Sequence, residues 1–579
     1  MTAAPKTPAL EPRPDLDAVI ATLGAARDSW ARTTNAERIA ILQEIKDNLM
    51  QVAEGWATTA ARHKLIPEGS ALVGEEWTSG PYAVMSACNG LIQTLSQMEG
   101  KAYLDHLGKR RTATGQLAVR VLPHTIWDRL LLSGVKAEVW MREGVTQANL
   151  ADHTAAAYDT PVARRQGKVA LVLGAGNIAA ISPLDAFQKL FSEHQVVVLK
   201  MNPVNDYLTE YLEAALKPLI DRDALRIVKG GADVGAYLCN HPDVAEIHIT
   251  GAAATHDAIV WGPGAEGAAN KAAGTPKLTK HITSELGAVC PTIVVPGAWS
   301  AADLRFQAEH LATQKLHNSG FNCVACQMLV LPRDWDGKDR LMSNLRDVLS
   351  GEAQRQPWYP GAKDRMAEFE SRGKNVVRLD RGGVPPVALV PVDATTDDWY
   401  RRNEIFAPAL STHEIAETDP EAYLRAAVAY ANDALYGTLG ANIIIHPDTI
   451  RQIGASRFEE IIGDLHYGTI AINAWTGLGF LASACPWGAF PGHTLDDVQS
   501  GIGFAHNTFM FDSPERVVIE APWQPFPRNL LSGRFSLLPR PPWFITNRKQ
   551  DKVGKLLTGF QHRPSWLKLP RIFLNALLG

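Results

Sequence analysis

The chain has 579 residues, of which 46% are hydrophobic and 20% are charged, and its formal net charge is −4. This balance is typical of globular proteins. It excludes a disordered chain and a strongly basic nucleic-acid-binding protein, so we expect no nucleic-acid partner. No run of 18 or more apolar residues occurs, which excludes a transmembrane helix, and the length predicts two or three domains.

The cysteines and the N-terminus bear on the compartment. The six cysteines are scattered, which is not the pattern of a secreted disulfide framework. Residues 1–14 are rich in Ala and Pro and lack an apolar core, so they predict a disordered lead and not a signal peptide. A cytoplasmic location is therefore expected.

Two helices are predicted for residues 15–65. Thr34 and Glu37 have the spacing of a capping box, in which each side chain accepts the backbone N–H of the other residue. Apolar residues then recur at helical spacing, namely Ile39, Ile41, Leu42, Ile45, Leu49 and Val52. Residues 66–165 predict helical patches and a strand at 135–141, and we identify no chemistry there.

Residues 168–251 alternate short apolar runs with helical segments and carry glycine at the turns. The apolar runs predict strands at 169–173, 196–199, 225–228 and 247–250. This alternation predicts an open parallel α/β sheet, in which ligands bind beyond the carboxyl ends of the strands. The ligand-facing edge would then carry Asn177, Lys200, Gly230 and Gly251.

The rest of the chain predicts a mobile, Gly- and Ala-rich surface insertion at 261–276, a second α/β domain at 300–475, and an edge strand at 516–520. Within the second domain, Cys323 stands between a helical run and a strand-like run. A helix terminus and polar neighbours can set the pKa of such a thiol, so this turn suits a nucleophile. A free cysteine is also commonly a small buried hydrophobe, and the turn alone does not decide between the two.

Several motifs in one order make residues 20–520 resemble the aldehyde dehydrogenase superfamily. They are His241-Pro242-Asp243-Val244 through Thr250-Gly251, Glu285-Leu286-Gly287, Asn318-x-Gly320-x-x-Cys323, Glu404-Ile405-Phe406-Ala407-Pro408, and Asn177 standing 23 residues before Lys200. The resemblance implies an aldehyde dehydrogenase-like α/β fold with a Rossmann-type cofactor domain, an α/β catalytic domain and a small oligomerisation strand element.

The resemblance also implies a division of the chain into domains. The disordered lead (1–14) precedes a helical N-terminal region with the cofactor-binding domain (15–286), the catalytic domain (287–475), the return to the cofactor domain with the oligomerisation strand (476–522), and a basic, aromatic C-terminal extension (523–579). The extension lies beyond the usual end of the family. We expect a homo-oligomer.

The resemblance assigns catalysis to three residues. Cys323 would attack an aldehyde carbonyl, the Asn177 amide would hold the oxyanion, and Glu285 would activate water to release the acid. The cofactor, NAD or NADP, would be bound by Lys200, Gly230, Gly251, Glu404 and Phe406. The sequence therefore predicts an enzyme that oxidises an apolar aldehyde to the carboxylic acid.

The sequence departs from the family's pattern around the cofactor and the oxyanion. The Pro-Trp usual before Asn177 is absent, Ala252 replaces a serine, and Pro203 stands where many NAD-preferring members carry Glu. Without that carboxylate there is no negative charge at this position to repel the 2′-phosphate of NADP, so NADP is not excluded. Two alternatives stay open: an acyl-CoA reductase of the same fold, against which the retained Glu285 argues, and a catalytically idle scaffold.

Two further features have two interpretations each. Cys326 forms a Cys-x-x-Cys pair with Cys323, but a single pair does not indicate zinc, so we predict no metal and a neighbouring thiol able to form a disulfide under oxidation. Trp475, Phe480 and Trp487 fall where the resemblance places the substrate entrance. They line an apolar channel or belong to the core, and the sequence does not decide.

The extension at 523–579 carries ten Lys/Arg and one Asp, a net charge of +9, which leaves −13 on the rest of the chain. Aromatic and aliphatic residues interleave with these charges. Such a segment is typical of peripheral membrane contact, in which basic groups meet anionic lipid and rings sit at headgroup depth. The alternative is an arm packed on the acidic body or on a partner subunit.

Overall fold

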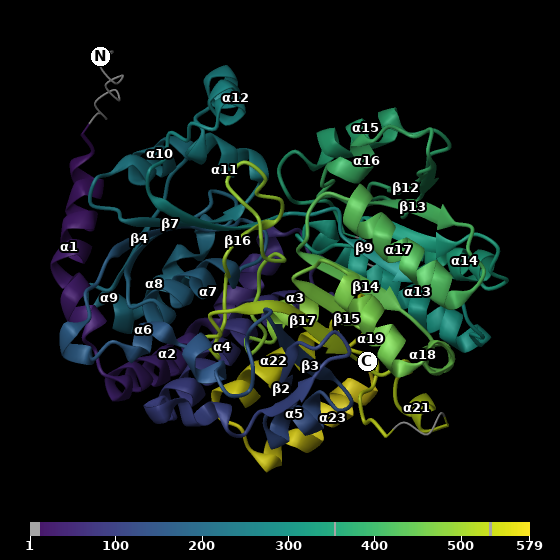
Figure 1. Cartoon of the computed structure of the whole chain (residues 1–579), viewed down its shortest axis with the longest axis horizontal. Coiled ribbons are helices and arrows are strands. Elements are labelled where there is room, and N and C mark those ends of the chain that lie inside the picture. The colour runs from purple at the N-terminus through teal and green to yellow at the C-terminus, as the bar shows by residue number, and fades with distance from the viewer. Residues whose placement is uncertain (1–11, 352–354, 532–534) are drawn as a thin grey trace.

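The structure is a computed structural model that describes residues 12–351, 355–531 and 535–579. It contains a six-stranded sheet in the left lobe of Figure 1 and an eleven-stranded sheet that runs from the bottom of the molecule into the right lobe. The predicted lead at 1–14 lies almost wholly outside the described residues. The first helices, α1 (Pro14–Ala31) and α2 (Asn35–His63), confirm the prediction for residues 15–65, and the capping box of Thr34 and Glu37 is formed.

The six-stranded sheet has the order β16-β8-β7-β4-β5-β6, in which β16 is antiparallel to β8 and the other neighbours are parallel. Its strands are β4 (Val169–Leu173), β5 (Val196–Lys200), β6 (Leu225–Val228), β7 (Glu246–Gly251), β8 (His281–Leu286) and β16 (Gly501–Ile502). The helices that pack on them include α1, α7 (Ile181–Phe187), α9 (Lys217–Ile220), α10 (Ala232–Asn240) and α11 (Ala253–Val260). Their cover explains why the apolar runs of β4 and β5 are buried, and the predicted parallel α/β sheet is confirmed.

The eleven-stranded sheet has the order β1-β2-β3-β17-β15-β14-β9-β10-β13-β12-β11. Its strands are β1 (Gly108–Arg111), β2 (Leu117–Leu122), β3 (Lys136–Met141), β9 (Pro291–Val294), β10 (Met328–Pro332), β11 (Val377–Leu379), β12 (Val387–Pro391), β13 (Ala409–Ile415), β14 (Gly440–Ile444), β15 (Thr469–Ile472) and β17 (Pro514–Glu520). The middle of the sheet, from β17 to β12, is parallel. The helices around it include α13 (Ala301–Leu316), α14 (Lys338–Gly351), α15 (Ala362–Arg372), α17 (Pro420–Ala434) and α19 (Ala455–Asp464).

The strand predicted at a sheet edge is internal. β17 is parallel to β15 on one side and antiparallel to β3 on the other, so both of its edges are hydrogen-bonded within this chain. The edge prediction was wrong because β3 lies more than 370 residues earlier, and a local pattern carries no information on such a pairing.

The sheets bear on the predicted domain boundary at residue 286. β8 and β9 lie on either side of it and belong to different sheets, and β16 returns to the cofactor-side sheet. β1, β2 and β3 precede the boundary, yet they belong to the eleven-stranded sheet. The division into domains remains a prediction.

The surface insertion predicted at 261–276 contains a helix, α12 (Gly264–Ala273). Its alanines favour helix, and the helix ends at Gly274, whose φ of 64° supplies the left-handed residue that commonly terminates one. The segment is mostly exposed, as a surface insertion would be, and it contains a helix between its glycines; its mobility stays a prediction.

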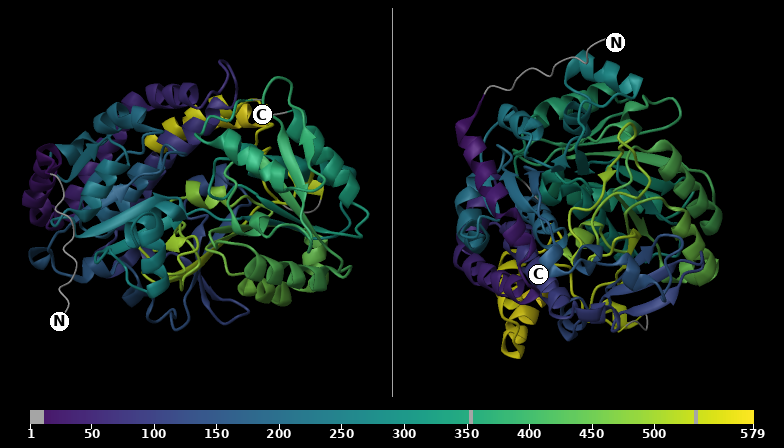
Figure 2. Two further views of the ribbon diagram at one scale, coloured as in Figure 1. Left: turned by 90° about the horizontal axis from the view of Figure 1, so that it is seen from above. Right: turned by 60° about the vertical axis from the view of Figure 1, so that its left-hand side comes forward.

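The C-terminal extension packs on the body (Figure 2). It contains α21 (Arg528–Leu531), α22 (Gln550–His562) and α23 (Leu569–Leu577), and α22 contacts α2, α3 (Val73–Trp77) and α4 (Ala83–Ser96). Lys555 Nζ lies 2.7 Å from Glu54 Oε1, and Arg563 Nη2 lies 3.2 Å from Asp47 Oδ1. These pairs agree with the predicted arm on the acidic body. None of the described helices is both long and apolar enough to cross a membrane.

Candidate active site

A cleft of about 690 Å³ opens at the carboxyl ends of β4, β5 and β7 and reaches the loops after α13 and before β13. The predicted site residues that line it are Asn177, Lys200, Gly251, Glu285, Cys323, Glu404 and Phe406. Gly230 is not part of this lining: its φ is 146°, it lies close to Val234, and Gly231 forms the wall in its place. The structure thus brings seven of the eight predicted residues to one cleft.

The cysteine lies on a turn that begins where α13 ends. Asn318 and Ser319 adopt the left-handed backbone, with φ of 53° and 56°, and Gly320 follows with φ of 83°. A Cβ at Gly320 would lie 2.7 Å from the carbonyl oxygen of Ala407, so this position requires glycine for both its conformation and its space. The turn thereby holds Cys323 beside the loop that carries Glu404.

The side chains of Cys323 and Glu285 are neighbours in the lining of the cleft, and each affects the pKa of the other. Burial raises the pKa of Glu285 to about 7, although the nearby Cys323 thiol and the hydrogen bond that Trp487 Nε1–H donates to Oε1 at 3.1 Å favour the carboxylate. Burial and the neighbouring carboxyl raise the pKa of the Cys323 thiol well above its ordinary value. At neutral pH the thiol is therefore protonated, and the carboxyl beside it is poised to accept its proton.

Asn177 follows β4 and is linked to the cysteine turn by two hydrogen bonds that side-chain amides donate. Its Nδ2–H donates to the Phe321 carbonyl at 3.0 Å, and the Asn318 amide donates to the Asn177 carbonyl at 3.1 Å. A primary amide has two N–H groups, and among the described residues Asn177 Nδ2 has this one acceptor. Its second N–H is left for a ligand oxygen.

Glu404 lies in the cleft directly beside Gly287. A Cβ at Gly287 would overlap the Glu404 carboxyl, so the glycine of the 285–287 motif makes room for it. Burial and the nearby Glu285 raise the pKa of Glu404 to about 8. Within the part of the chain that the structure describes, its buried Oε1 has no hydrogen-bond partner, which leaves an acceptor for a ligand hydroxyl.

The other end of the cleft can accept an anion. Lys200 is the last residue of β5, and burial lowers the pKa of its ammonium group. Asn202 lines the same wall of the cleft. Gly251 and Ala252 lead into α11, whose free N–H groups and helix dipole favour a negative charge such as pyrophosphate. Pro203 is exposed next to this wall, and no carboxylate stands at its position.

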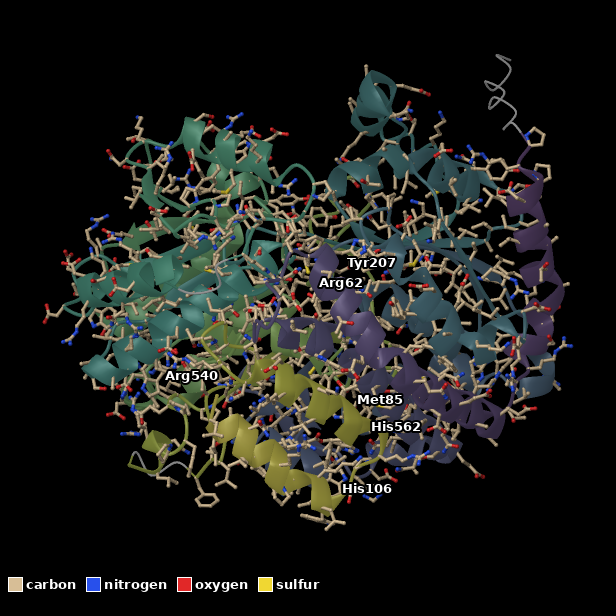
Figure 3. All side chains as sticks on the ribbon, turned by 180° about the vertical axis from the view of Figure 1, so that it is seen from behind. Arg62, Met85, His106, Tyr207, Arg540 and His562 are labelled. Carbon is tan, nitrogen blue, oxygen red and sulfur yellow. The ribbon has the colours of Figure 1, made fainter. Side chains whose placement is uncertain are left out.

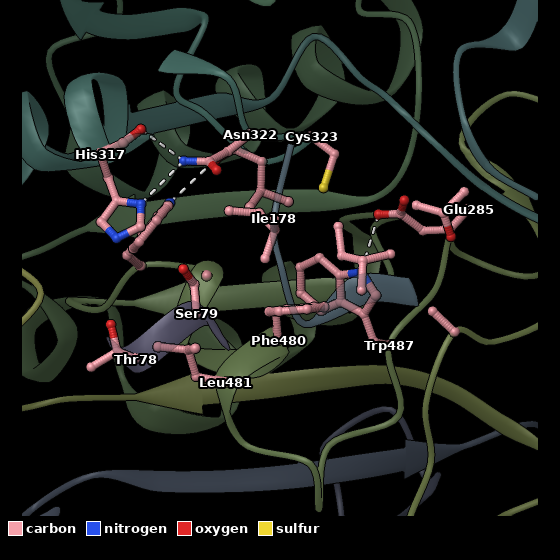
Figure 4. A pocket seen from close by; sticks show the side chains of 16 residues that line it. Thr78, Ser79, Ile178, Glu285, His317, Asn322, Cys323, Phe480, Leu481 and Trp487 are labelled. Atoms are coloured by element: carbon pink, nitrogen blue, oxygen red, sulfur yellow. Dashed lines mark hydrogen bonds between the residues drawn. The ribbon is translucent and has the colours of Figure 1, made fainter. Parts of the chain in front are cut away.

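A second, apolar pocket meets the cleft at Cys323 and Glu285 (Figure 4). Its walls include Ile178, Ile181, Trp475, Phe480, Leu481 and Trp487, and its free volume is about 40 Å³. The three aromatic residues left undecided by the sequence therefore line a pocket, with Trp475 and Trp487 also buried. Cys323 therefore lies where a narrow apolar pocket meets the large cleft.

A family model described as the aldehyde dehydrogenase family matches residues 195–488, which is just over half of the chain. The chain belongs to the aldehyde dehydrogenase family. The matched segment contains Lys200, Glu285, Cys323 and Glu404, whereas Asn177 precedes it.

Relatives of known structure share the aldehyde dehydrogenase fold. The gamma-glutamyl-gamma-aminobutyraldehyde dehydrogenase of Burkholderia cenocepacia J2315 has a TM-score of 0.58 and 18% identity, with 88% of each chain covered. A variant of aldehyde dehydrogenase C from Pseudomonas syringae, crystallised with NAD+ and octanal, has a TM-score of 0.57 and 17% identity, covering 88% of this chain and 89% of that one.

A curated relative matches over a shorter length. The betaine aldehyde dehydrogenase of Brucella melitensis biotype 2 is 26% identical over 297 residues, which are 48% of this chain and 53% of that protein. The chain thus spans about half the length of the curated relatives it matches.

The cleft contains residues that the motifs did not reveal. Arg365 and Tyr359 line the cleft near Glu404. Arg365 Nε–H donates to the Phe406 carbonyl at 3.2 Å, and its buried Nη2 has no partner among the described residues. The rings of Tyr359 and Phe406 are 5.1 Å apart, edge to face. Nothing in the spacing of residues 355–365 signals this role, because the segment reaches the cleft only through the tertiary fold.

Cys323 and the nearby Cys290 and Cys326 are all free thiols. Cys290 Sγ–H donates to the Cys323 carbonyl at 3.3 Å, and Cys326 is buried, with its pKa raised to about 11 by that burial. A disulfide between Cys323 and Cys326 under oxidation therefore stays a prediction.

Proposed function

We propose that this chain is an NAD(P)-dependent aldehyde dehydrogenase that oxidises an apolar aldehyde to its carboxylic acid. The observation that carries the proposal is the Cys323–Glu285 pair, which stands where the apolar pocket meets the large cleft. The pocket suits the alkyl or aryl part of a substrate, and the cleft suits a dinucleotide. A structural relative crystallised with octanal supports an apolar substrate class.

Covalent attack is the first step that these residues support. Glu285 accepts the thiol proton, and the Cys323 sulfur bonds to the aldehyde carbon to give a thiohemiacetal. The second N–H of Asn177 and the backbone N–H of Cys323 stabilise the oxyanion. Loss of one such donor typically costs about 2.7–4 kcal/mol in the barrier.

The cleft residues fit a nicotinamide dinucleotide. Lys200 and Glu404 would bind its two riboses, the N-terminus of α11 would face the pyrophosphate, and Arg365 would add positive charge next to Phe406. The unpartnered Oε1 of Glu404 and Nη2 of Arg365, each within the described part of the chain, support this fit. A bound nicotinamide supplies the hydride acceptor that leaves a thioester on Cys323.

Glu285 acts a second time in release of the acid. After it has released the thiol proton to solvent, it accepts a proton from a water molecule whose oxygen attacks the thioester carbon. The C–S bond then breaks, the carboxylic acid leaves, and Glu285 returns its proton to the sulfur of Cys323. This use of Glu285 favours hydrolysis over the thiol exchange of an acyl-CoA reductase. The departures around Asn177 and Ala252 are what keep a catalytically idle scaffold as the remaining alternative.

An aldehyde panel of increasing chain length, assayed with NAD and with NADP, tests the proposed function. We expect kcat/KM to rise with chain length because each buried CH₂ contributes about 0.8 kcal/mol. Since Pro203 leaves the 2′-position unguarded, we expect NADP to be used as well as NAD. Activity that requires CoA would indicate the reductase, and no turnover with any aldehyde would indicate the scaffold.

We further propose that the extension contacts an anionic membrane surface through η8 (Trp566–Lys568) and α23. The large apolar side chains that face solvent there are Leu567 (91% exposed), Trp566 (59%), Leu574 (59%), Leu578 (58%) and Leu577 (54%). Leu569 and Ile572 pack inward, so α23 is apolar on both faces. Residues 552–579 contain Lys and Arg but neither Asp nor Glu, which complements anionic lipid and disfavours pairing with a second copy of itself.

Sedimentation with vesicles tests the membrane proposal. The wild type is expected to sediment with anionic vesicles and not with neutral ones. The double variant Leu567→Gln/Leu574→Gln is expected to bind anionic vesicles at least about tenfold more weakly. Leu65→Gln, which changes an exposed leucine outside the extension, is the control. Equal sedimentation of all three proteins, or a dimer that only the double variant loses, would contradict the proposal. Homo-oligomerisation and a cytoplasmic location stay predictions.

A further inference from the structure

The C-terminal extension reaches the active site through the contact of α22 with the five-residue helix α3. A Cβ at Gly74 of α3 would overlap the Gln550 carbonyl group. A Cβ at Gly554 of α22 would lie 2.8 Å from the Cβ of Trp77. One glycine on each helix therefore lets the two backbones touch, and any added carbon pushes them apart.

Side chains on both sides hold α22 in this position, and Figure 3 shows His562 at the end of this helix. The Asn89 amide of α4 donates to the carbonyl oxygen and to Oε1 of Gln561, at 2.9 and 2.8 Å. Lys555 pairs with Glu54 of α2, and His562 at the end of the helix pairs with Asp47. The extension thus joins α2, α3 and α4 in one contact surface.

α3 carries Glu75, whose carboxylate reaches the catalytic turn. Its Oε2 accepts the backbone N–H of Asn318 at 3.0 Å and Arg355 Nη2–H at 3.0 Å. Arg355 Nε–H in turn donates to Ser319 Oγ at 2.6 Å. Asn318 and Ser319 are the two left-handed residues of the turn, a conformation that such residues keep only where their surroundings hold it. The buried Glu75–Arg355 pair stabilises this left-handed conformation of the turn.

The π-helical turn η1 (Thr78–Tyr82) continues from α3 into the wall of the apolar pocket. Thr78 and Ser79 form the side of the pocket away from Glu285 (Figure 4). The Ser79 carbonyl accepts the backbone N–H of Ala180 at 3.0 Å, so this wall is also joined to the loop that carries Asn177. A displacement of α3 moves the catalytic turn and the pocket wall together.

We propose that the C-terminal extension is a positioning element of the active site: α22 holds α3 and η1, which set the geometry of the Cys323 turn and the shape of the apolar pocket. The residues that transmit this are Glu75, Arg355 and Ser79. The extension therefore determines both the reactivity of the nucleophile and the discrimination among aldehydes, and the second part rests on the proposed function.

Two glycine-to-alanine variants of the same helix test this. Gly554→Ala places a methyl against Trp77, whereas a Cβ at Gly559 meets nothing within 4 Å, so Gly559→Ala is the matched control with the same gain in helix propensity. Alkylation by iodoacetamide reports on Cys323, because the other five cysteines are buried. It requires no aldehyde turnover, so it separates a failure of this proposal from a failure of the proposed function.

We expect Gly554→Ala to change the alkylation rate of Cys323, and the ratio of kcat/KM for long and short aldehydes, by at least about fivefold. Gly559→Ala should keep both within about twofold, and both measurements are made well below the Tm of each variant. Unchanged alkylation and an unchanged ratio in Gly554→Ala would overturn the proposal.

If Gly554→Ala does not fold, Asn89→Ala decides instead. This variant removes only the side-chain bonds that hold the end of α22 at Gln561. We expect a change in both quantities in the same direction and of smaller size, about twofold to threefold. Wild-type values for Asn89→Ala together with a lowered Tm would show that α22 contributes stability alone, which overturns a positioning role.

Discussion

Replacement of Cys323 by alanine is expected to abolish aldehyde-dependent NAD(P)H formation, a fall of about 10⁴-fold or more. In the proposed mechanism the Cys323 sulfur bonds to the aldehyde carbon, so neither the thiohemiacetal nor the thioester can form without it. Glu285 would remain beside the cleft as a carboxyl with no thiol proton to accept. The reduced nicotinamide is measured by its absorbance, and cofactor binding, followed separately, should persist because Lys200 and Glu404 are untouched.

Cys326→Ala is the matched control for this substitution. Cys326 lies three residues further along, is buried, and is absent from the lining of both the cleft and the apolar pocket. Replacing a buried thiol by alanine costs some stability but leaves the reacting groups in place. We therefore expect the control to retain most of its turnover. Unchanged turnover in Cys323→Ala, or equal loss in both variants, would refute Cys323 as the nucleophile.

The grouping of Asn177, Lys200 and Glu285 could be predicted because each of them lies at or just beyond the end of a strand. Lys200 ends β5, Glu285 lies in β8, and Asn177 follows β4, and the carboxyl ends of parallel strands meet at one edge of a sheet. Short motifs mark these strand ends in the sequence, so residues more than 100 positions apart were placed together correctly. Gly230 does not line the cleft whereas its neighbour Gly231 does, and a motif does not encode the backbone angles that distinguish the two.

Features that depend on distant pairings could not be predicted in this way. Glu75 and Arg355 are separated by 280 residues, and neither belongs to a motif, yet they meet behind the catalytic turn. β17 was predicted at an edge for the same reason: the strands β17 and β3 are both visible in the sequence, but their pairing is not. The apolar pocket also assembles from η1, the β4 loop and residues 475–487, so the sequence left its aromatic residues undecided.

Glu285→Gln is expected to lower steady-state turnover by about 10²–10⁴-fold, the usual contribution of a general base. Glutamine keeps the shape of the side chain and can still accept from Trp487 Nε1–H, so the pocket should stay intact. It cannot accept a proton from the Cys323 thiol or from water. If attack by Cys323 survives in part, NAD(P)H should appear in an initial burst followed by a slow phase, because the thioester accumulates.

The pH dependence of the wild type tests the same assignment. Burial raises the pKa of Glu285 to about 7, so the carboxyl is protonated below that pH and ionised above it. Only the ionised form accepts a proton, and kcat limited by acid release should therefore rise as the pH passes through about 7 and then level off. The slow phase of Glu285→Gln should lack this rise. A wild-type profile that is flat between pH 5 and 9, or a variant that retains the rise at about pH 7, would show that another group is the base.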